Sequence, residues 1–176
     1  MSWFQNLSIR SKVMTAFASV LVITVVLGTF AINRLSAVND NAVALSSNYL
    51  VASKALGDVA YNSMRYRQLQ GAYVLAATKD GKAKEAATMA TAAGEVTKGW
   101  NAYSPTIDQG VETALAAKIM PAWNAYAAMN DKFMELSNTN PAAGGALLTG
   151  EMRTAFHQFT DALQADQDYQ VKAGNA

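Results

Sequence analysis

Arg65, Tyr66 and Arg67 form the segment of this sequence whose side chains have the most specific chemistry. The planar guanidinium of an arginine matches the two oxygens of a carboxylate and forms two parallel, charge-assisted hydrogen bonds with it. Because Arg65 and Arg67 are two positions apart, their side chains on a helix diverge by about 200° and cannot reach one pocket in the same chain. The pattern predicts that one of them binds a carboxylate. The alternative is that both are solvated surface residues beside a hydrated seam.

Further polar residues follow the same helix toward its C-terminal end. Tyr66, Gln70 and Tyr73 continue the helical spacing on which Ser63 also lies, so four successive positions of one seam are polar. Their hydroxyl and amide groups both donate and accept hydrogen bonds, so they could hold hydroxyl or carbonyl groups of a ligand.

A later helix, antiparallel to the first, should face this level with Arg153, Thr154 and His157. Arg153 could supply a third positive charge for a di- or tricarboxylate. His157 lies between two phenylalanines, where a lone histidine is more often a packing or surface residue than a ligand group. The candidate ligand-binding residues are therefore Asn62, Arg65, Tyr66, Arg67, Gln70, Tyr73, Arg153, Thr154 and His157.

Composition excludes most catalytic and metal-dependent chemistry. The chain has no cysteine and one histidine, which excludes disulfides, iron–sulfur clusters and multi-histidine zinc sites. The Gly144–Gly145 pair lacks the lysine and hydroxyl residue of a phosphate-binding loop. A net charge of +1 without a basic run argues against nucleic-acid binding. We expect no enzymatic activity, no catalytic residue, no cofactor and no metal.

An uncharged segment near the N-terminus predicts a membrane anchor. Residues 13–33 carry no charge and, at about 1.5 Å per residue, span roughly 30 Å of hydrocarbon. A cleaved signal peptide is the alternative, but its apolar core is about 7–15 residues long. Arg10 and Lys12 precede the segment, which predicts a cytoplasmic N-terminus over residues 1–12. Residues 34–176 are then exported, which in a bacterial cell places them in the periplasm, anchored to the inner membrane.

The exported part shows four blocks in which apolar residues recur at alternating steps of three and four, the spacing of helices that bury one stripe. No stretch alternates with the period of a strand. The sequence predicts an all-α fold, an antiparallel up-down-up-down four-helix bundle whose first helix continues from the transmembrane helix. The seam residues are Leu35, Val38, Ala42, Leu45, Tyr49, Ala52, Leu56 and Val59; Ala86, Met89, Ala93, Val96, Trp100, Tyr103 and Ile107; Val111, Leu115, Ile119, Ala122, Tyr126, Met129, Phe133 and Leu136; and Leu148, Met152, Ala155, Phe159 and Ala162.

The breaks between blocks carry turn signals. Residues 78–81 should end the first helix, Pro105 the second, and residues 137–141 should form a loop after the third. Within these, Asn140 should cap the fourth helix with Pro141 at its first position, and Pro121 should kink the third helix. In such a bundle the first and fourth helices end at one membrane face, so we expect a second span after residue 176 in a longer protein.

The start of the chain, Leu7 to Val13 (LSIRSKV), followed by an apolar span and a four-helix segment with Arg65 to Arg67 near the distal end of its first helix, resembles the N-terminal half of a bacterial methyl-accepting chemotaxis receptor. The block Tyr126 to Gln164, with its loop and then Glu151 to Arg153, also resembles the third and fourth helices of that sensor. The same sensor also occurs on histidine kinases and diguanylate cyclases, which is the alternative function. A third possibility is a ligand-free module that reads another periplasmic protein.

The resemblance implies a homodimer that binds a small ligand at its distal end and passes a piston-like shift down the fourth helix. A C-terminal half absent from this chain would then control a cytoplasmic histidine kinase. The stripe of Asn62, Arg65, Leu69, Ala72 and Ala76 suits packing against the same helix of a partner. One site would combine Arg67 of one chain with Arg65 of the other.

Receptors of this kind hold a carboxylate at the dimer interface with arginines from both subunits. They carry further arginines nearer the tip, where this sequence has Gln70 and Tyr73. We therefore expect an organic or aromatic acid as the ligand.

Overall fold

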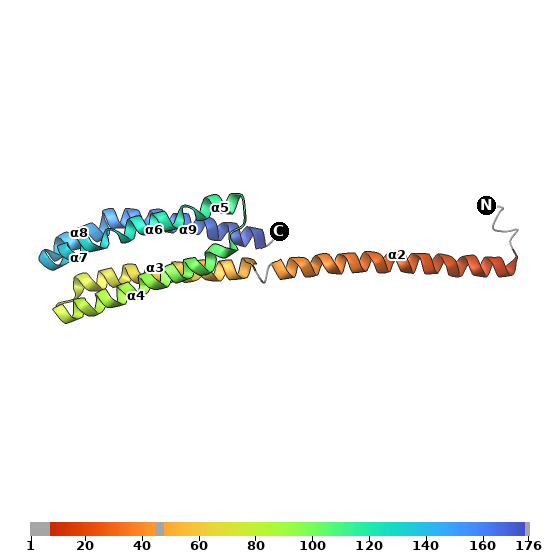
Figure 1. The fold of residues 1–176 in the computed structure, drawn as a ribbon, viewed down its shortest axis with the longest axis horizontal. Helices are drawn as coiled ribbons and strands as arrows, with labels where there is room; N and C mark the ends of the chain where they lie inside the picture. Colours follow the sequence, from red (N-terminus) through yellow and green to blue (C-terminus); the bar gives the residue numbers. More distant parts are fainter. Residues whose placement is uncertain (1–7, 45–47, 175–176) are drawn as a thin grey trace. The chain divides into compact units, whose positions relative to one another are not determined.

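The computed structural model describes residues 8–44 and 48–174, and the chain divides into two compact units, Met1–Ala44 and Leu45–Ala176 (Figure 1). The first unit is the helix α2, Ile9–Ala44. The predicted continuation of this helix into the bundle falls on residues 45–47, outside the described residues. After them come a short π-helical turn at Asn48 and Tyr49 and then the bundle.

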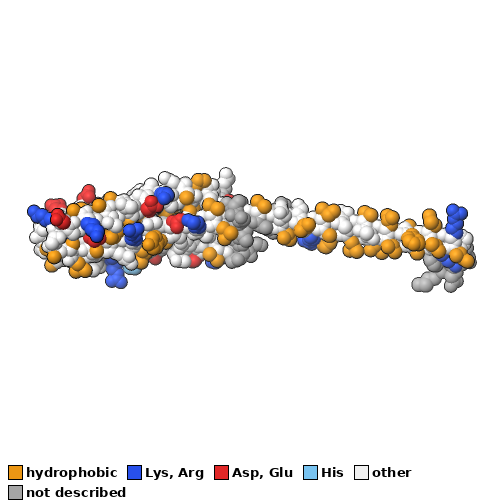
Figure 2. Space-filling view, turned by 90° about the horizontal axis from the view of Figure 1, so that it is seen from below, with side chains coloured by type: hydrophobic (Ala, Val, Ile, Leu, Met, Phe, Trp, Pro, Cys, Tyr) orange, Lys and Arg blue, Asp and Glu red, His pale blue; other side chains and the backbone are white. Residues whose placement is uncertain are grey.

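Helix α2 is suited to a hydrocarbon environment. Its segment Ile9–Ser36 is long enough to cross a membrane, contains an 18-residue stretch with a mean hydropathy of 2.3, and includes the predicted span 13–33. Four hydroxyl side chains donate to the carbonyl four residues earlier at 2.8–2.9 Å, which leaves these donors paired where water is absent. They are Thr15, Ser19, Thr24 and Thr29. The large apolar side chains of α2 are exposed, including Leu35 and Val38, which the seam pattern predicted to be covered. Figure 2 shows charged side chains spread over the visible face of the bundle, whereas α2 carries none between Lys12 and Arg34.

The second unit is the predicted four-helix bundle. The first helix is α3 (Leu50–Leu75) and the second is α4 (Lys79–Tyr103), followed by the short 3-10 helix η2 (Ser104–Thr106). The third segment consists of α5 (Val111–Ala116), α6 (Ile119–Ala127) and α7 (Asn130–Thr139), and the fourth of α8 (Pro141–Thr149) and α9 (Glu151–Gly174). Within the unit, α3 packs against α4, α8 and α9, and α9 also packs against α5 and α6 (Figure 1). The described residues contain no strand.

Helix ends follow the turn chemistry of the sequence. The Thr78 hydroxyl accepts a hydrogen bond from the Gly81 amide and caps α4. The Asn140 side chain accepts from the Ala143 amide, with Pro141 at the start of α8, as predicted. Pro121 lies inside α6. Helix α5 ends at Ala116, five residues before Pro121, because a proline ring disturbs the carbonyl four residues earlier in a helix.

The predicted loop over residues 137–141 is wrong for its first part. Helix α7 continues through Thr139, because the Asn140 amide donates to the Leu136 carbonyl at 2.7 Å and the Ser137 hydroxyl to the Phe133 carbonyl at 2.7 Å. Asn140 alone makes the turn. A hypothetical Cβ on Gly144 would lie 2.2 Å from the Ser137 Oγ, so α8 can fold back onto α7 only with glycine there.

The buried seam agrees with the predicted spacing in α3, where Ala52, Leu56, Val59, Ser63, Tyr66, Gln70 and Tyr73 are all buried. The middle of the bundle is aromatic, with Tyr66, Trp123, Tyr126, Phe156 and Phe159 in ring contacts whose centroids lie 5.0–6.1 Å apart. The seam prediction for Val111 is wrong, since its side chain is 65% exposed and Glu112 is buried instead. The reason is that Glu112 has hydrogen-bond partners inside the bundle, described below.

The close contact at Gly144 generates a prediction for stability. Replacing Gly144 by Ala should destabilise the chain by about 1–3 kcal/mol, because the new methyl group overlaps Ser137. Urea denaturation of the chain in detergent micelles measures this. The matched control is Gly145→Ala, where a Cβ meets nothing within 4 Å, so the better helix propensity of Ala should stabilise α8 by up to about 1 kcal/mol. Equal stabilities of the two variants would contradict the packing of α8 on α7.

Candidate functional site

Arg67 is held inside the bundle by three other helices of the same chain. Its Nη2 donates to the Leu148 carbonyl of α8 at 3.1 Å, and its Nη1 donates to the Tyr126 hydroxyl of α6 at 3.4 Å. The guanidinium carbon lies 5.0 Å from the ring centroid of Phe156 on α9, a cation–π contact. These contacts orient a half-buried cation and use two of its five N–H donors.

Arg65 and Asn62 lie elsewhere on α3. Arg65 is exposed, as its separation from Arg67 by two positions on a helix requires. Asn62 is half-buried and donates to the Asp58 carbonyl one turn earlier at 2.9 Å. Within one chain, the structure does not bring the two arginines into one pocket.

The polar seam residues of α3 are buried and paired with other side chains. Tyr66 packs edge-on against Trp123, and burial, together with the neighbouring Tyr126 and Asp131, raises the pKa of its phenol. Gln70 accepts a hydrogen bond from the Tyr126 hydroxyl and donates to Asn130 Oδ1 at 3.0 Å.

Farther along the seam, the Tyr73 hydroxyl donates to Asn138 Oδ1 at 3.1 Å. Each of these three polar seam residues of α3 therefore contacts the third helical segment.

Arg153, Thr154 and His157 lie on the exposed side of α9. Arg153 Nε donates to His157 Nε2 at 3.4 Å, which requires that imidazole nitrogen to be unprotonated. The Thr154 hydroxyl donates to the Gly150 carbonyl at 3.5 Å. The nine candidate residues thus fall into four groups: an exposed set, the half-buried Asn62, the internally bound Arg67, and the buried seam.

A stripe that is exposed except at two half-buried glycines runs along α3 and is called the exposed stripe below. It contains large apolar side chains at helical spacing, with Tyr61 66% exposed, Met64 49% exposed and Leu75 85% exposed. Gly57 and Gly71 lie at the same spacing, and a Cβ at either would meet nothing within 4 Å. The stripe consists of Leu50, Lys54, Gly57, Tyr61, Met64, Gln68, Gly71 and Leu75.

The stripe predicted for a partner lies beside this one. Leu69 packs against the core of its own chain, and Asn62, Ala72 and Ala76 are half-buried. Arg65 is the member that stays exposed, next to Met64. The most exposed apolar face of α3 is therefore rotated by about one residue from the predicted face.

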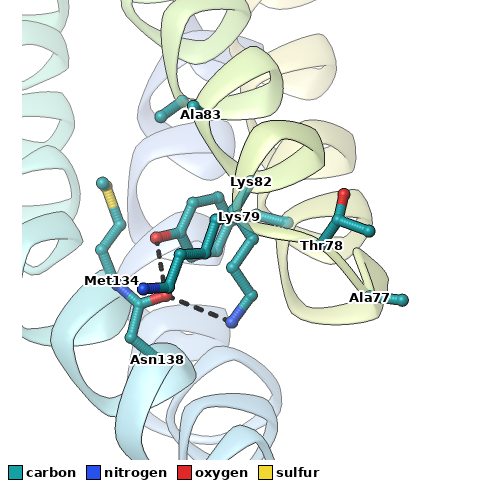
Figure 3. A pocket seen from close by; sticks show the side chains of 9 residues that line it. Ala77, Thr78, Lys79, Lys82, Ala83, Met134 and Asn138 are labelled. Carbon is teal, nitrogen blue, oxygen red and sulfur yellow. Dashed lines mark hydrogen bonds between the residues drawn. The ribbon is translucent and has the colours of Figure 1, made fainter.

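The distal end of the bundle, where α3 turns into α4, contains a pocket of about 570 Å³ (Figure 3). Tyr73 is the only candidate residue from the sequence that lines it. Lys79 and Lys82 from the first turn of α4 and Asn138 from α7 also line it, and sequence reasoning missed them. The signal for the lysines was their spacing of three positions, with Lys79 inside the predicted break at residues 78–81 and Lys82 directly after it. The full lining is Tyr73, Ala77, Thr78, Lys79, Lys82, Ala83, Ala86, Met134 and Asn138.

A second polar cluster lies at the other end of the bundle, where α9 ends. Tyr103, Glu112, Asp166 and Gln170 are at most 1% exposed. The Tyr103 hydroxyl is 2.8 Å from Glu112 Oε1 and also contacts Asp166 Oδ2. The Tyr103 hydroxyl has one proton and can donate to only one carboxyl group at a time. For both contacts to be hydrogen bonds, one of the two carboxyl groups must itself carry a proton.

Electrostatics support a proton on this cluster. Burial raises the pKa of Asp166 and the nearby Glu112 raises it further, while the hydrogen bond from Tyr103 lowers it; the net direction is upward. Burial and both carboxylates raise the pKa of Tyr103 as well. Gln170 Nε2 donates to Glu112 Oε1, and the Asp108 amide donates to Glu112 Oε2 at 2.7 Å.

The sequence carried a signal for this cluster that was not used. The seam of the fourth helix continues from Phe159 and Leu163 to Asp166 and Gln170 with steps of three and four. Polar residues at seam spacing are buried here for the same reason as on α3, because each finds a partner across the bundle.

Comparison with known protein families identifies the chain. Residues 6–176 match the family described as a four helix bundle sensory module for signal transduction. The chain belongs to this family. A comparison with curated proteins found no match. The predicted resemblance to the sensor half of methyl-accepting chemotaxis receptors is confirmed at the level of this family.

The sensory module has two polar regions separated by an aromatic layer. Arg67 and the distal pocket lie on one side of this layer, and the Tyr103 cluster lies on the other, at the end of α9. The family is a signal-transduction module, and the described residues hold no group of three or more metal-ligating side chains.

The raised pKa of Asp166 predicts a pH-dependent stability. The Asp166 carboxyl binds its proton more tightly in the folded sensory module than in the unfolded chain. The contribution of this proton to the free energy of unfolding is therefore complete below the ordinary pKa of 3.8 and is lost as pH rises through the folded pKa. One proton gives a slope of at most about 1.4 kcal/mol per pH unit. Denaturant unfolding in micelles from about pH 4 to about pH 8 measures this fall.

Asp166→Asn keeps an acceptor for Tyr103 but has no titrating proton, so this fall should be absent from its pH profile. Asp168→Asn is the control, because Asp168 is exposed on the same helix and accepts from Gln164. Identical pH profiles for the wild type and Asp166→Asn would contradict the prediction.

Proposed function

We propose that this sensory module is the input part of a transmembrane chemoreceptor, in which a homodimer binds a small carboxylate and passes a conformational shift across the membrane. In this proposal α2 spans the bacterial inner membrane, the N-terminus is cytoplasmic and the bundle is periplasmic. Family membership and the apolar segment Ile9–Ser36 support this arrangement. A C-terminal half of the receptor would carry the signal to a cytoplasmic histidine kinase.

The exposed stripe of α3 is the observation on which the proposal mainly rests. Its eight positions recur in alternating steps of four and three, the spacing with which two helices pack side by side, and Leu50, Tyr61, Met64 and Leu75 are its exposed large apolar members. Glycine inside a helix costs about 1 kcal/mol relative to alanine. Gly57 and Gly71 are not required by packing within the chain, because a Cβ would fit at both. Close approach of a second α3 would account for them.

The arginines provide the carboxylate chemistry at this interface. Three N–H donors of Arg67 remain after its contacts with Leu148 and Tyr126, so its guanidinium can still bind an anion. Arg65 lies beside the exposed stripe and would face the partner chain. The proposed site pairs Arg67 of one chain with Arg65 of the other, and the exposed Arg153, Thr154 and His157 would lie at its margin.

A ligand on Arg67 would be coupled directly to the fourth segment. Arg67 contacts the Leu148 carbonyl of α8 and the Phe156 ring of α9. A carboxylate that draws the guanidinium toward the partner chain would weaken or shift both contacts. The displaced element would be α9, the helix that ends at the opposite end of the bundle.

The interface can be tested by cross-linking, since the native chain has no cysteine. Met64→Cys in the full chain, reconstituted in nanodiscs, should form an intermolecular disulfide on oxidation because the two copies of residue 64 would face each other across the dimer. Thr91→Cys, on the exposed side of α4, is the control and should remain reduced. Equal cross-linking of the two variants would show random collision and contradict the α3 interface.

The shared site predicts complementation between two inactive variants. Binding of organic acids to the reconstituted chain should be detectable by calorimetry. Arg65→Ala and Arg67→Ala should each lower affinity by thirty-fold or more, since an unpaired buried charge costs about 2–5 kcal/mol. Mixed dimers of the two variants contain one intact Arg67–Arg65 pair, so half of the sites in the mixed dimers, or about a quarter of all sites after equal mixing, should regain native affinity. Lys84→Ala is the control, because Lys84 is exposed on α4.

No recovery on mixing would contradict a site shared between chains. Loss of binding in Arg67→Ala with unchanged binding in Arg65→Ala would place the site within one chain. Substitution of either arginine by lysine should also weaken binding, because an ammonium cannot reproduce the planar fork.

A further inference from the structure

The distal pocket has the features of a ligand site that is separate from the arginines. Its volume of about 570 Å³ lies within the range of small-molecule sites, about 300–1,000 Å³. It lies between the α3–α4 turn and α7 of a single chain, as Figure 3 shows, so it requires no partner subunit.

The charges at the pocket are of one sign and are not neutralised. Lys79 and Lys82 are three positions apart on α4 and therefore lie on the same side of that helix. The ion pairs of the described residues are Lys54–Asp58 and Lys98–Glu95, so neither pocket lysine has a carboxylate within 4 Å. The residues that line the pocket include no acid. An anion is the ligand that this charge distribution favours.

Lys82 is already positioned for such an anion. Its ammonium donates to the Ser137 carbonyl at 2.6 Å and to Asn138 Oδ1 at 3.2 Å, and it lies 5.3 Å from the ring centroid of Tyr73. An ammonium has three donors, so one remains. Lys79 has no hydrogen bond or ion pair among the described residues, and its ammonium can close on a bound anion.

Apart from the two lysines, Thr78 and Asn138, the lining is mainly apolar. Ala77, Ala83 and Ala86 line the pocket together with the Met134 thioether and the buried Tyr73. Sulfur and aromatic edges both make favourable contacts with a flat ring. A second carboxylate on the ligand would be left against these apolar side chains, which disfavours dicarboxylates here.

We propose that the distal pocket binds a small monocarboxylate with a flat apolar body, with its carboxylate between Lys79 and Lys82 and its body against Ala86, Met134 and Tyr73. The site goes beyond the proposed arginine site, since it lies within one chain and excludes a second charge. A ligand there links α4 to α7, so it would bias the packing of the second segment against the third.

Benzoate is the probe, titrated by calorimetry into the full chain in nanodiscs. Benzoate should bind at least ten-fold more tightly than benzamide, which lacks the charge, and than acetate, which lacks the body. Lys79→Gln should weaken benzoate binding at least ten-fold. Its matched control is Lys84→Gln, an exposed lysine of the same helix outside the pocket, which should bind as the native chain does.

Absence of benzoate binding, or equal affinities for benzoate, benzamide and acetate, would overturn the proposal. Benzoate binding that is lost in Arg65→Ala but retained in Lys79→Gln would place the ligand at the dimer interface and also overturn it. Retained binding in Arg65→Ala together with loss in Lys79→Gln supports the distal pocket, whatever the outcome for the arginine site.

Discussion

A polar side chain on the buried seam of this bundle needs a hydrogen-bond partner, because burying it unpaired costs about 1–3 kcal/mol, and the longer side chains find that partner across the bundle. Gln70 meets this constraint through Tyr126 and Asn130, and Tyr73 meets it through Asn138. Each of these hydrogen bonds joins α3 to the third segment at one particular level. The apolar contacts alone would allow the helices to slide by a turn, whereas these pairs specify one register.

Tyr126 makes several of the contacts between helices that specify this register. It accepts from Arg67 and donates to Gln70, while its ring lies 5.0 Å from that of Phe156. The same side chain thus contacts Arg67, Gln70 and Tyr66 of α3, and Phe156 of α9. Because Arg67 also contacts the Leu148 carbonyl, a change at its guanidinium reaches the third and fourth segments without an intermediate. This gives the proposed sensor a direct physical connection between ligand and output helix.

The spacing of the helices explains why the pocket forms where it does. A Cβ on Gly99 would lie 2.9 Å from Val59 Cγ2, so glycine at this position allows α4 to approach α3 closely. Toward the distal end, the space between α4 and α7 is bridged by Lys82 rather than by a large apolar side chain. A long, charged side chain can span this gap without filling it, which leaves room for a ligand.

The sequence by itself determined the class of the fold, the apolar span, the caps at Asn140 and Pro141, and nearly all of the buried seam of α3. These features follow from local properties, namely hydropathy, helical period and turn chemistry, which act over a few residues. It also determined that Arg65 and Arg67 point in different directions, because helix geometry alone requires this.

Tertiary structure decided which partners each polar residue has. Spacing could place Gln70 on the seam but could not show that Tyr126 pairs with it, and it could not show that Glu112 rather than Val111 is buried beside Tyr103. Nor could it show that Lys82 reaches Ser137, 55 positions along the chain. Such contacts depend on how four helices are rotated and shifted against one another, which is set by the whole core at once. That arrangement made Arg67 an internal contact and Tyr73 part of the wall of a pocket.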